Sequence, residues 1–297
     1  MNAGIIQMLE QLQRLRVEQG LSGKVHGYSR AISNIKKFPE QIVSGEHATT
    51  ISGVGKSIAN HIDEFLRTGR VAELAGTEEK EQVINLFMSV YMVGMETANT
   101  WYNAGYRNLT QIPRSICTDA QWIGIQFREE FLQKIPRSEI DEFKSLFNEH
   151  ATKLNILFEI CGSYRRGKTS SGDIDVLIID QPGRNILSEI LTFPYFTHTL
   201  AYGTKKYRGV IQLPGKIHRR IDLELVQPYE YPFAVVYFTG PDSFNRKMRT
   251  YCEQLGYRLN EKCILDQQGI PRSVQSEEHL FQVLGLVYLT PEEREKY

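Results

Sequence analysis

The sequence lacks the features that mark several common protein classes. It contains no run of about 18 consecutive apolar residues, the length that a membrane-spanning helix needs, and Met1–Gly4 shows no signal-peptide pattern. Its 35 Lys and Arg residues balance 35 Asp and Glu residues, so no global basic field indicates nucleic acid. We therefore expect a soluble intracellular protein whose nucleic-acid contacts, if it makes any, come from local basic patches. Nucleus, cytoplasm and, for a viral protein, the virion remain open.

Cysteine is also scarce. The four cysteines show no CxxC spacing, and they are Cys117, Cys161, Cys252 and Cys263. We expect reduced thiols and neither a disulfide framework nor a zinc site. At 297 residues the chain is long enough for two or more domains with their own cores.

The most informative segment combines a turn, two acids and an apolar run. Gly162–Gly167 reads Gly-Ser-Tyr-Arg-Arg-Gly, and Ser171-Gly172-Asp173-Ile174-Asp175 follows, directly before the apolar Val176–Ile179. Residues i and i+2 of a strand project from the same face, so Asp173 and Asp175 can share a divalent metal. An isolated Asp-x-Asp is more often a solvated strand end. The neighbouring Gly-Ser turn and Arg pair, which suit phosphate, favour a metal site here.

A third acid is predicted on a neighbouring strand. In His218–Val226, alternation places Arg220, Asp222 and Glu224 on one face and the apolar residues on the other. Asp222 can therefore complete a carboxylate triad. Two-metal nucleotidyl transfer needs such a triad, because one ion activates the attacking hydroxyl and the other neutralises the triphosphate. Hard oxygen ligands and a phosphate substrate favour Mg²⁺.

The first part of the chain reads as helices joined by a glycine turn. Apolar residues recur at helical spacing over Ile5–Leu15 and again over Tyr28–Phe38, where Pro39 ends the pattern. Gly55-Lys56-Ser57 imitates a P-loop, but Thr50 stands where that motif needs its first glycine. A helix-hairpin-helix fits Ile51–Ala59 better, because two glycines allow a tight turn that offers backbone N–H groups to a phosphate. Met92–Ala98 is a second copy, in which Met92 replaces the first glycine.

These motifs together resemble a known family. Cys161–Ile179, His218–Leu225, Tyr237–Gly240 and Leu259–Glu261 look like the X family of DNA polymerases, most closely its DNA polymerase beta type, and the similarity extends almost from end to end. The resemblance implies an α+β multidomain fold in four parts. An all-helical, lyase-like domain with the first hairpin would span 1–75, and a duplex-binding subdomain with the second hairpin 76–135. A catalytic palm, a mixed sheet with helices, would span 136–230, and a small α/β nucleotide-selection subdomain 231–297.

The activity that the resemblance implies is template-directed filling of short gaps in base excision repair, without proofreading. Asp173 and Asp175 would bind two Mg²⁺ ions, with Mn²⁺ as an alternative, and Asp222 would bind the catalytic ion and act on the primer 3′-hydroxyl. The implied partners are dNTP, gapped or nicked DNA with a 5′-phosphate and, as a further candidate, a DNA ligase. We expect a monomer without a membrane partner.

The resemblance also assigns contact residues. Among them, Ser163, Arg166 and Gly172 would hold the β- and γ-phosphates, and Tyr237 and Phe238 would face the incoming sugar. The full set of implied nucleotide contacts is Lys134, Gly162, Ser163, Arg166, Gly172, Tyr237, Phe238, Gly240, Asp242 and Asn245. The implied DNA contacts are Lys24, Tyr28, Gly53, Gly55, Lys56, Gly94, Arg220, Arg246 and Arg249. Na⁺ or K⁺ would be held by the main-chain carbonyls of Thr49, Ile51, Val54, Met88, Val90 and Val93.

One departure concerns the lyase position. In polymerase beta a lysine forms a Schiff base with a 5′-deoxyribose phosphate, and the alignment puts His61 in its place. Imidazole cannot form the same stable imine, so we expect lyase activity to be weak or absent. Lys24 and Lys56 are the alternative amines.

Two local expectations and two alternative functions complete the prediction. We expect a cis Gly240–Pro241 bond, because proline lowers the cost of the cis form, and a Glu224–Lys262 ion pair in place of the family's conformational switch. A noncatalytic scaffold that binds DNA ends is one alternative. A nucleotidyltransferase that acts on another acceptor is the second, since fold alone does not fix function.

Overall fold

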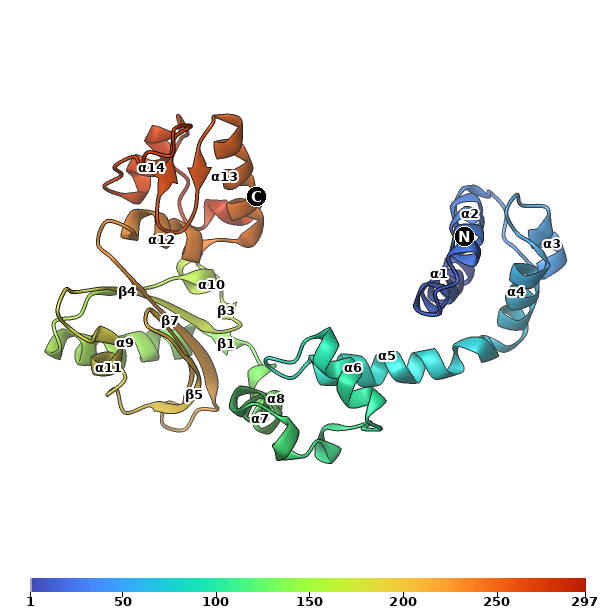
Figure 1. Ribbon diagram of the computed structural model, residues 1–297, viewed down its shortest axis with the longest axis horizontal. Coiled ribbons are helices and arrows are strands. Elements are labelled where there is room, and N and C mark those ends of the chain that lie inside the picture. Colours follow the sequence, from blue (N-terminus) through green and yellow to red (C-terminus); the bar gives the residue numbers. More distant parts are fainter. Residues whose placement is uncertain (1) are drawn as a thin grey trace. The chain divides into compact units, whose positions relative to one another are not determined.

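The computed structural model describes residues 2–297. The chain divides into two compact units, of which the first comprises residues 1–89 and 93–112 and the second residues 90–92 and 113–297 (Figure 1). In the described residues, no helix is long and apolar enough to cross a membrane.

The first unit is helical. Its α-helices are α1 (Ala3–Glu18), α2 (Ser22–Lys37), α3 (Gly45–Thr49), α4 (Lys56–Thr68), α5 (Ala75–Met88) and α6 (Met95–Asn103). Short 3₁₀ turns follow at η1 (Ala72–Leu74) and η2 (Leu109–Gln111). The apolar residues that predicted the first two helices, among them Leu9, Leu12 and Ile35, are buried in a common core, which confirms both helices.

The second unit is built around a five-stranded sheet. Its helical elements are η3 (Arg114–Ile116), α7 (Asp119–Gln126), α8 (Arg128–Phe131), α9 (Arg137–Lys153), α10 (Gly162–Arg165), α11 (Ile186–Ile190), α12 (Tyr231–Thr239), α13 (Asp242–Gln254), α14 (Glu277–Val283) and η4 (Glu293–Lys296). Its strands are β1 (Ile135–Pro136), β2 (Phe158–Ile160), β3 (Ser170–Ser171), β4 (Ile174–Ile179), β5 (Phe196–Tyr202), β6 (Lys206–Ile211), β7 (Arg219–Val226), β8 (Arg258–Leu259) and β9 (Ile264–Leu265). The predicted α+β class is confirmed.

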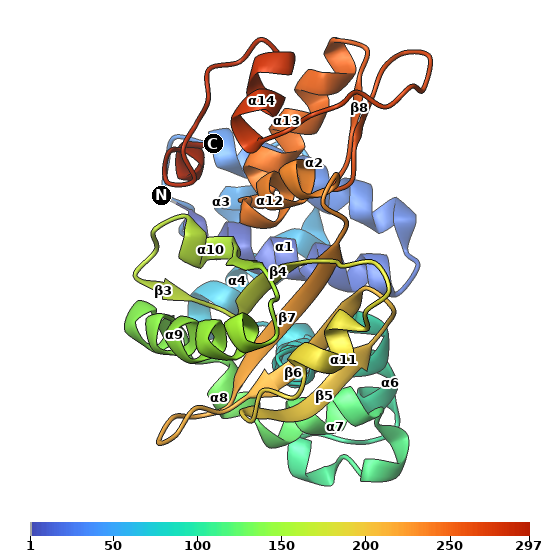
Figure 2. The same cartoon turned by 90° about the vertical axis from the view of Figure 1, so that its left-hand side faces the viewer.

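The main sheet is mixed, with the order β2-β4-β7-β6-β5 (Figure 2). Strands β4 and β7 are parallel, and their neighbours β2 and β6 run antiparallel to them. The predicted alternation of β7 is confirmed, because Ile221, Leu223 and Leu225 are buried while Asp222 and Glu224 are partly exposed.

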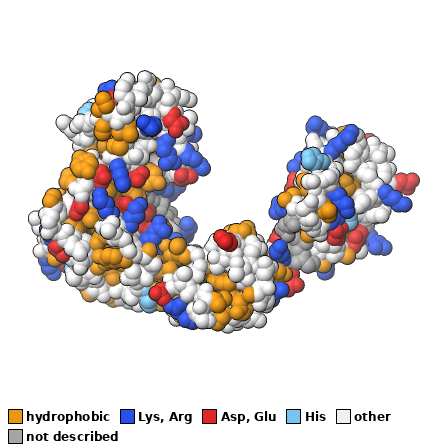
Figure 3. Space-filling model, viewed as in Figure 1, with side chains coloured by type: hydrophobic (Ala, Val, Ile, Leu, Met, Phe, Trp, Pro, Cys, Tyr) orange, Lys and Arg blue, Asp and Glu red, His pale blue; other side chains and the backbone are white. Residues whose placement is uncertain are grey.

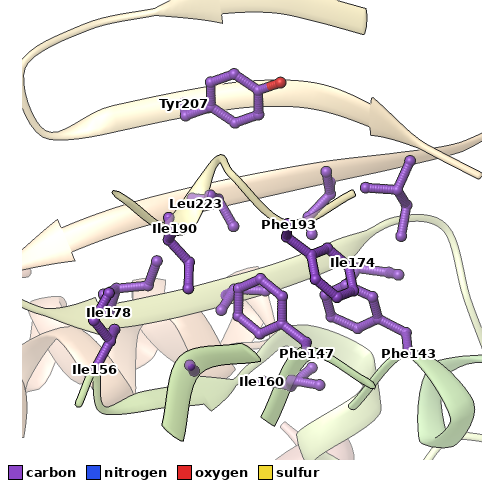
Figure 4. Close-up of a cluster of buried hydrophobic side chains, with 14 of the residues drawn as sticks. Phe143, Phe147, Ile156, Ile160, Ile174, Ile178, Ile190, Phe193, Tyr207 and Leu223 are labelled. Atoms are coloured by element: carbon purple, nitrogen blue, oxygen red, sulfur yellow. The ribbon is translucent and has the colours of Figure 1, made fainter. Parts of the chain in front are cut away.

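One face of the sheet packs on helices α9 and α11. Phe143 and Phe147 of α9 lie against Phe193 and the apolar side of the strands, and all are buried (Figure 4). The rings of Phe143 and Phe147 stack with centroids 5.0 Å apart. On the opposite face, Leu177 of β4 and Val226 of β7 pack on Ala234 and Val235 of α12, so only the other ends of these strands remain available for polar side chains.

The C-terminal helices are tied to the sheet by a buried ion-pair cluster. Glu277 at the start of α14 accepts hydrogen bonds from Arg165 of α10 at 3.0 and 2.9 Å and from Arg294 at 2.8 Å. Arg294 is fully buried, and Glu277 is 6% exposed. Before this segment, the Gly240–Pro241 bond is cis, as expected, and α13 confirms the helix predicted after it.

We predict that Glu277→Gln lowers the free energy of unfolding by about 3–5 kcal/mol, because it leaves the buried guanidinium of Arg294 and the partly buried guanidinium of Arg165 without their carboxylate. The measurement is denaturant unfolding of the full chain. Glu278→Gln, at the exposed neighbouring position, is the matched control and should have little effect. Equal stability of both variants would contradict a structural role for the cluster.

Candidate active site

The register of two parallel strands brings the predicted acids together. Asp175 of β4 lies directly opposite Asp222 of β7. Asp173 precedes β4 by one residue and is two residues from Asp175, on the same side of the chain. Three carboxylates therefore converge at the amino end of β4.

The electrostatics of the acids reflect this convergence. Burial, and next the carboxylates of Asp173 and Asp222, raise the pKa of Asp175 to about 7. Burial also raises the pKa of Asp222, against the attraction of Arg208. The cluster therefore carries negative charge that the protein only partly neutralises, which is the condition that a bound cation relieves.

Two arginines provide part of that neutralisation. Arg220 lies 3.3 Å from Asp173, and Arg208 of the neighbouring strand β6 lies 3.3 Å from Asp222. In this arrangement, no three Asp, Glu, His or Cys side chains among residues 2–297 form a group ready to hold a metal ion. The donor set itself fits Mg²⁺, since it consists of carboxylate oxygens.

The Gly-Ser turn packs directly on the acid cluster. Gly162 has a φ of 57°, and a Cβ atom there would lie 2.1 Å from Oδ2 of Asp175. The Cys161 N–H donates to the Asp175 carbonyl at 2.8 Å, which fixes the start of the turn. Ser163 follows in the short helix α10. Glycine is required here both by the backbone conformation and by the close carboxylate.

The structure places the expected triphosphate contacts around this turn. Lys134 Nζ lies 3.7 Å from where a Cβ of Gly172 would be. Arg166 donates through Nη1 to the Thr239 carbonyl at 2.5 Å, and its Nη1 lies 3.4 Å from where a Cβ of Gly240 would be. Figure 3 shows Lys and Arg side chains gathered on the second unit, with acidic side chains among them.

A cavity of about 220 Å³ joins the acids to the expected sugar contacts. Asp175, Asp222, Tyr237 and Phe238 line it together. The Asn245 amide donates to the Tyr237 carbonyl at 2.7 Å, so the start of α13 supports the Tyr237 backbone. On the exposed side of α13, Asp242 pairs with Arg246 at 3.3 Å, and Arg249 lies in a neighbouring small pocket together with Asn245.

The expected Glu224–Lys262 pair is not formed in this structure. Glu224 instead pairs with Lys206, its direct partner across β6 and β7, at 3.1 Å. The cross-strand register decides this, because it places the two side chains side by side. Lys262 lies in a loop near Glu224, where both line a common pocket.

The first hairpin turn has the geometry that its glycines predict. Gly53 has a φ of 95°, and a Cβ there would lie 2.9 Å from Cγ of Arg30. Gly55 caps α4, whose first residue is Lys56. Of the three carbonyls expected to hold a monovalent cation, that of Ile51 accepts from the Val54 N–H at 3.0 Å, while Thr49 ends α3.

The second turn repeats the positive φ of the first at the matching position, but with a residue other than glycine. Met92 has a φ of 62°, a conformation that glycine adopts more readily. Gly94 caps α6, as Gly55 caps α4. The expected cation carbonyls of Met88, Val90 and Val93 lie along this segment, between the end of α5 and the start of α6.

The lyase position lies in an ion-pair cluster of the first unit. His61 Nε2 is 3.4 Å from Glu73, which Arg16 holds at 2.5 and 2.8 Å. The hydrogen bond from Arg16 lowers the pKa of the Glu73 carboxyl below its ordinary value, although burial of Glu73 acts in the opposite direction. Tyr28 is buried beside Arg16, whose guanidinium lies 5.9 Å from its ring, while Lys24 is exposed.

Sequence reasoning missed three charged residues that touch the predicted site residues. They are Arg208, Glu295 and Glu73, which pair with Asp222, Arg166 and His61 respectively. The alternation of Lys206 and Arg208 predicts only that both lie on one face of β6, and the pairing of Arg208 with Asp222 depends on the register of β6 and β7. No local pattern indicates Glu295, because it is 129 residues from its partner.

Comparison with known proteins covers almost the whole chain. Four family models match the chain. They describe a helix-hairpin-helix domain (residues 1–71), the fingers domain of DNA polymerase lambda (85–132), the DNA polymerase beta palm (134–228) and the DNA polymerase beta thumb (234–295). The chain belongs to the X family of DNA polymerases. Among its relatives, DNA polymerase lambda of Rattus norvegicus is 32% identical over 99% of this chain and 56% of its own length. DNA polymerase lambda of Arabidopsis thaliana is 30% identical over 99% of this chain and 62% of its own length. This X family chain thus spans less than two thirds of the length of these two relatives.

We predict that Gly162→Ala lowers the rate of nucleotidyl transfer expected of this site by about a hundredfold, because the new methyl group displaces Asp175. Gly183→Ala is the matched control, since Gly183 also has a positive φ, of 80°, but a Cβ there meets nothing within 4 Å. Single-turnover kinetics and thermal melting of both variants separate the effect on the site from backbone strain. Equal loss of activity in both variants would refute the specific contact.

Proposed function

We propose that the chain is a template-directed DNA polymerase that fills short gaps by nucleotidyl transfer from dNTP to a primer 3′-hydroxyl. The observation that carries this proposal is the pairing of Asp175 with Asp222 beside Asp173 and the Gly162 turn. The membership in a polymerase family supports it. In this proposal residues 1–75 hold a DNA 5′ end, 76–135 hold the duplex, 136–230 carry the chemistry and 231–297 select the nucleotide.

The acids would hold two divalent ions, with Mg²⁺ the expected ion. Asp173 and Asp175 would bind both, and Asp222 the one nearer the primer terminus. When bound, such ions lower the pKa of the attacking hydroxyl and neutralise the leaving oxygens. Arg208 and Arg220, which now pair with these acids, would have to release them.

The other residues of the site would bind and orient the substrates. Arg166, Lys134 and backbone groups of the Gly162 turn would bind the triphosphate. Tyr237 and Phe238 line the cavity where the sugar would lie, which disfavours a 2′-hydroxyl. The two hairpin turns would bind the DNA backbone without reading its sequence, each with a Na⁺ or K⁺ ion. No residue in this proposal supplies proofreading.

We expect Asp222→Ala to lower primer extension across a short gap with a 5′-phosphate by at least about a hundredfold, because a metal-binding carboxylate is lost. Glu253→Ala, on the exposed side of α13, is the control and should extend like the parent. Gap binding by the parent without extension would instead support a noncatalytic scaffold. Incorporation that ignores the template would support a transferase with another acceptor.

For the lyase position we expect borohydride to trap little or no covalent DNA adduct with the parent protein. His61→Lys alone should restore little, because the carboxylate of Glu73 would keep the new amine protonated. Combining His61→Lys with Glu73→Gln should raise the adduct yield several-fold near neutral pH. Abundant trapping with the parent would show that another amine, such as Lys24 or Lys56, acts as the nucleophile. The control is the double variant that combines His61→Lys with Glu64→Gln. It also removes one negative charge, but at another acid, on α4.

A further inference from the structure

The last turn of the chain reaches back to the expected triphosphate site. Glu295 of η4 accepts a hydrogen bond from Nε of Arg166, and its second oxygen lies 2.7 Å from Nζ of Lys168. One carboxylate therefore bridges two cations that flank the Gly167 turn. Although burial opposes it, Lys168 and Arg166 hold the pKa of Glu295 below its ordinary value, so this residue is a carboxylate at neutral pH.

The hydrogen bonds of Arg166 leave part of its guanidinium for a ligand. Nε is used by Glu295 and Nη1 by the Thr239 carbonyl. An arginine has five N–H donors, and within residues 2–297 the structure gives the Nη2 group of Arg166 no partner. The positive charge of Arg166 also acts on the nearby Asp175 carboxyl. Arg166 thus lies between the acid cluster and Glu295, with one edge available.

We propose that Glu295 is an internal competitor of the triphosphate, which neutralises Arg166 and Lys168 without nucleotide and weakens nucleotide binding when one arrives. This inference rests on the proposed function, since it takes Arg166 as a triphosphate contact. A triphosphate brings several negative charges to the edge of a guanidinium that already has a carboxylate partner. The two anions repel each other, so the C-terminal turn sets the affinity of the site for nucleotide.

The sign of one substitution separates this role from simple positioning of Arg166. Glu295→Gln keeps the size of the side chain and an oxygen that accepts from Arg166, but it removes the negative charge. If Glu295 only orients Arg166, the variant binds triphosphate equally well or less well. If Glu295 competes, the variant binds triphosphate more tightly.

The test is calorimetric titration of the full chain with inorganic tripolyphosphate, without DNA, at low salt. We expect Glu295→Gln to bind at least about fivefold more tightly than the parent, and the difference to shrink as salt screens the charges. Glu295→Asp keeps the charge and should stay within about twofold of the parent. Glu292→Gln removes a charge from the same segment and should bind like the parent. The Cγ atom of Glu292 lies 3.1 Å from where a Cβ of Gly167 would be, and the described part of the chain shows no ion pair for this residue. Unchanged or weaker binding by Glu295→Gln, or no measurable binding by any variant, overturns the proposal.

Two further measurements separate this inference from the polymerase assignment. In the gap-filling assay the competitor role predicts a lower KM for dNTP in Glu295→Gln, and Arg166→Gln combined with Glu295→Gln should abolish the gain in tripolyphosphate affinity. A parent that extends no primer, but whose Glu295→Gln variant binds tripolyphosphate more tightly, refutes the polymerase assignment and keeps the role of Glu295. A parent that extends primers, with unchanged tripolyphosphate binding in the Glu295→Gln variant, supports the polymerase assignment and refutes the competitor role of Glu295. Melting curves of all variants check that the C-terminal turn still folds.

Discussion

The parallel register of β4 and β7 is the constraint on which the candidate site depends. It places Asp175 opposite Asp222 on one face and Ile174 opposite Ile221 in the core on the other. A slip of one residue would turn every side chain of a strand to the opposite face. The core beneath the sheet and the acids above it are therefore fixed by the same pairing, and neither can change without the other.

The negative charge of three neighbouring carboxylates requires neutralisation, and cationic side chains of the protein supply part of it. Arg220 and Arg208 neutralise two of the acids. The cation expected to bind phosphate is likewise paired, by Glu295. Because charges of both signs are already partly paired within the protein, substrate binding in the proposed function is in part an exchange of partners rather than only the creation of new ion pairs. Such an exchange moderates affinity, since each new contact replaces an existing one.

Much of this arrangement could be predicted from local patterns. The alternation over His218–Val226 and the spacing of Asp173 and Asp175 predicted the strands and the faces of the acids, and the glycines predicted the first hairpin turn. The ion pairs could not be predicted in this way. Arg208 reaches Asp222, and Lys206 rather than Lys262 reaches Glu224, only through the register of β6 and β7. Local patterns define an element and its faces, whereas the partner of a long side chain depends on which elements become neighbours.

The two sites that we propose to bind phosphate differ in how well their expected chemistry is preserved. The acid cluster keeps all three carboxylates, Asp173, Asp175 and Asp222. In the first unit His61 Nε2 lies 3.4 Å from Glu73, a carboxylate that Arg16 holds. A carboxylate at that place both opposes an incoming phosphate and would keep a nearby amine protonated, so a single lysine at position 61 would not by itself recreate a Schiff-base site. In our proposal two residues therefore disfavour Schiff-base chemistry, and introducing it requires a change in charge as well as a nucleophile.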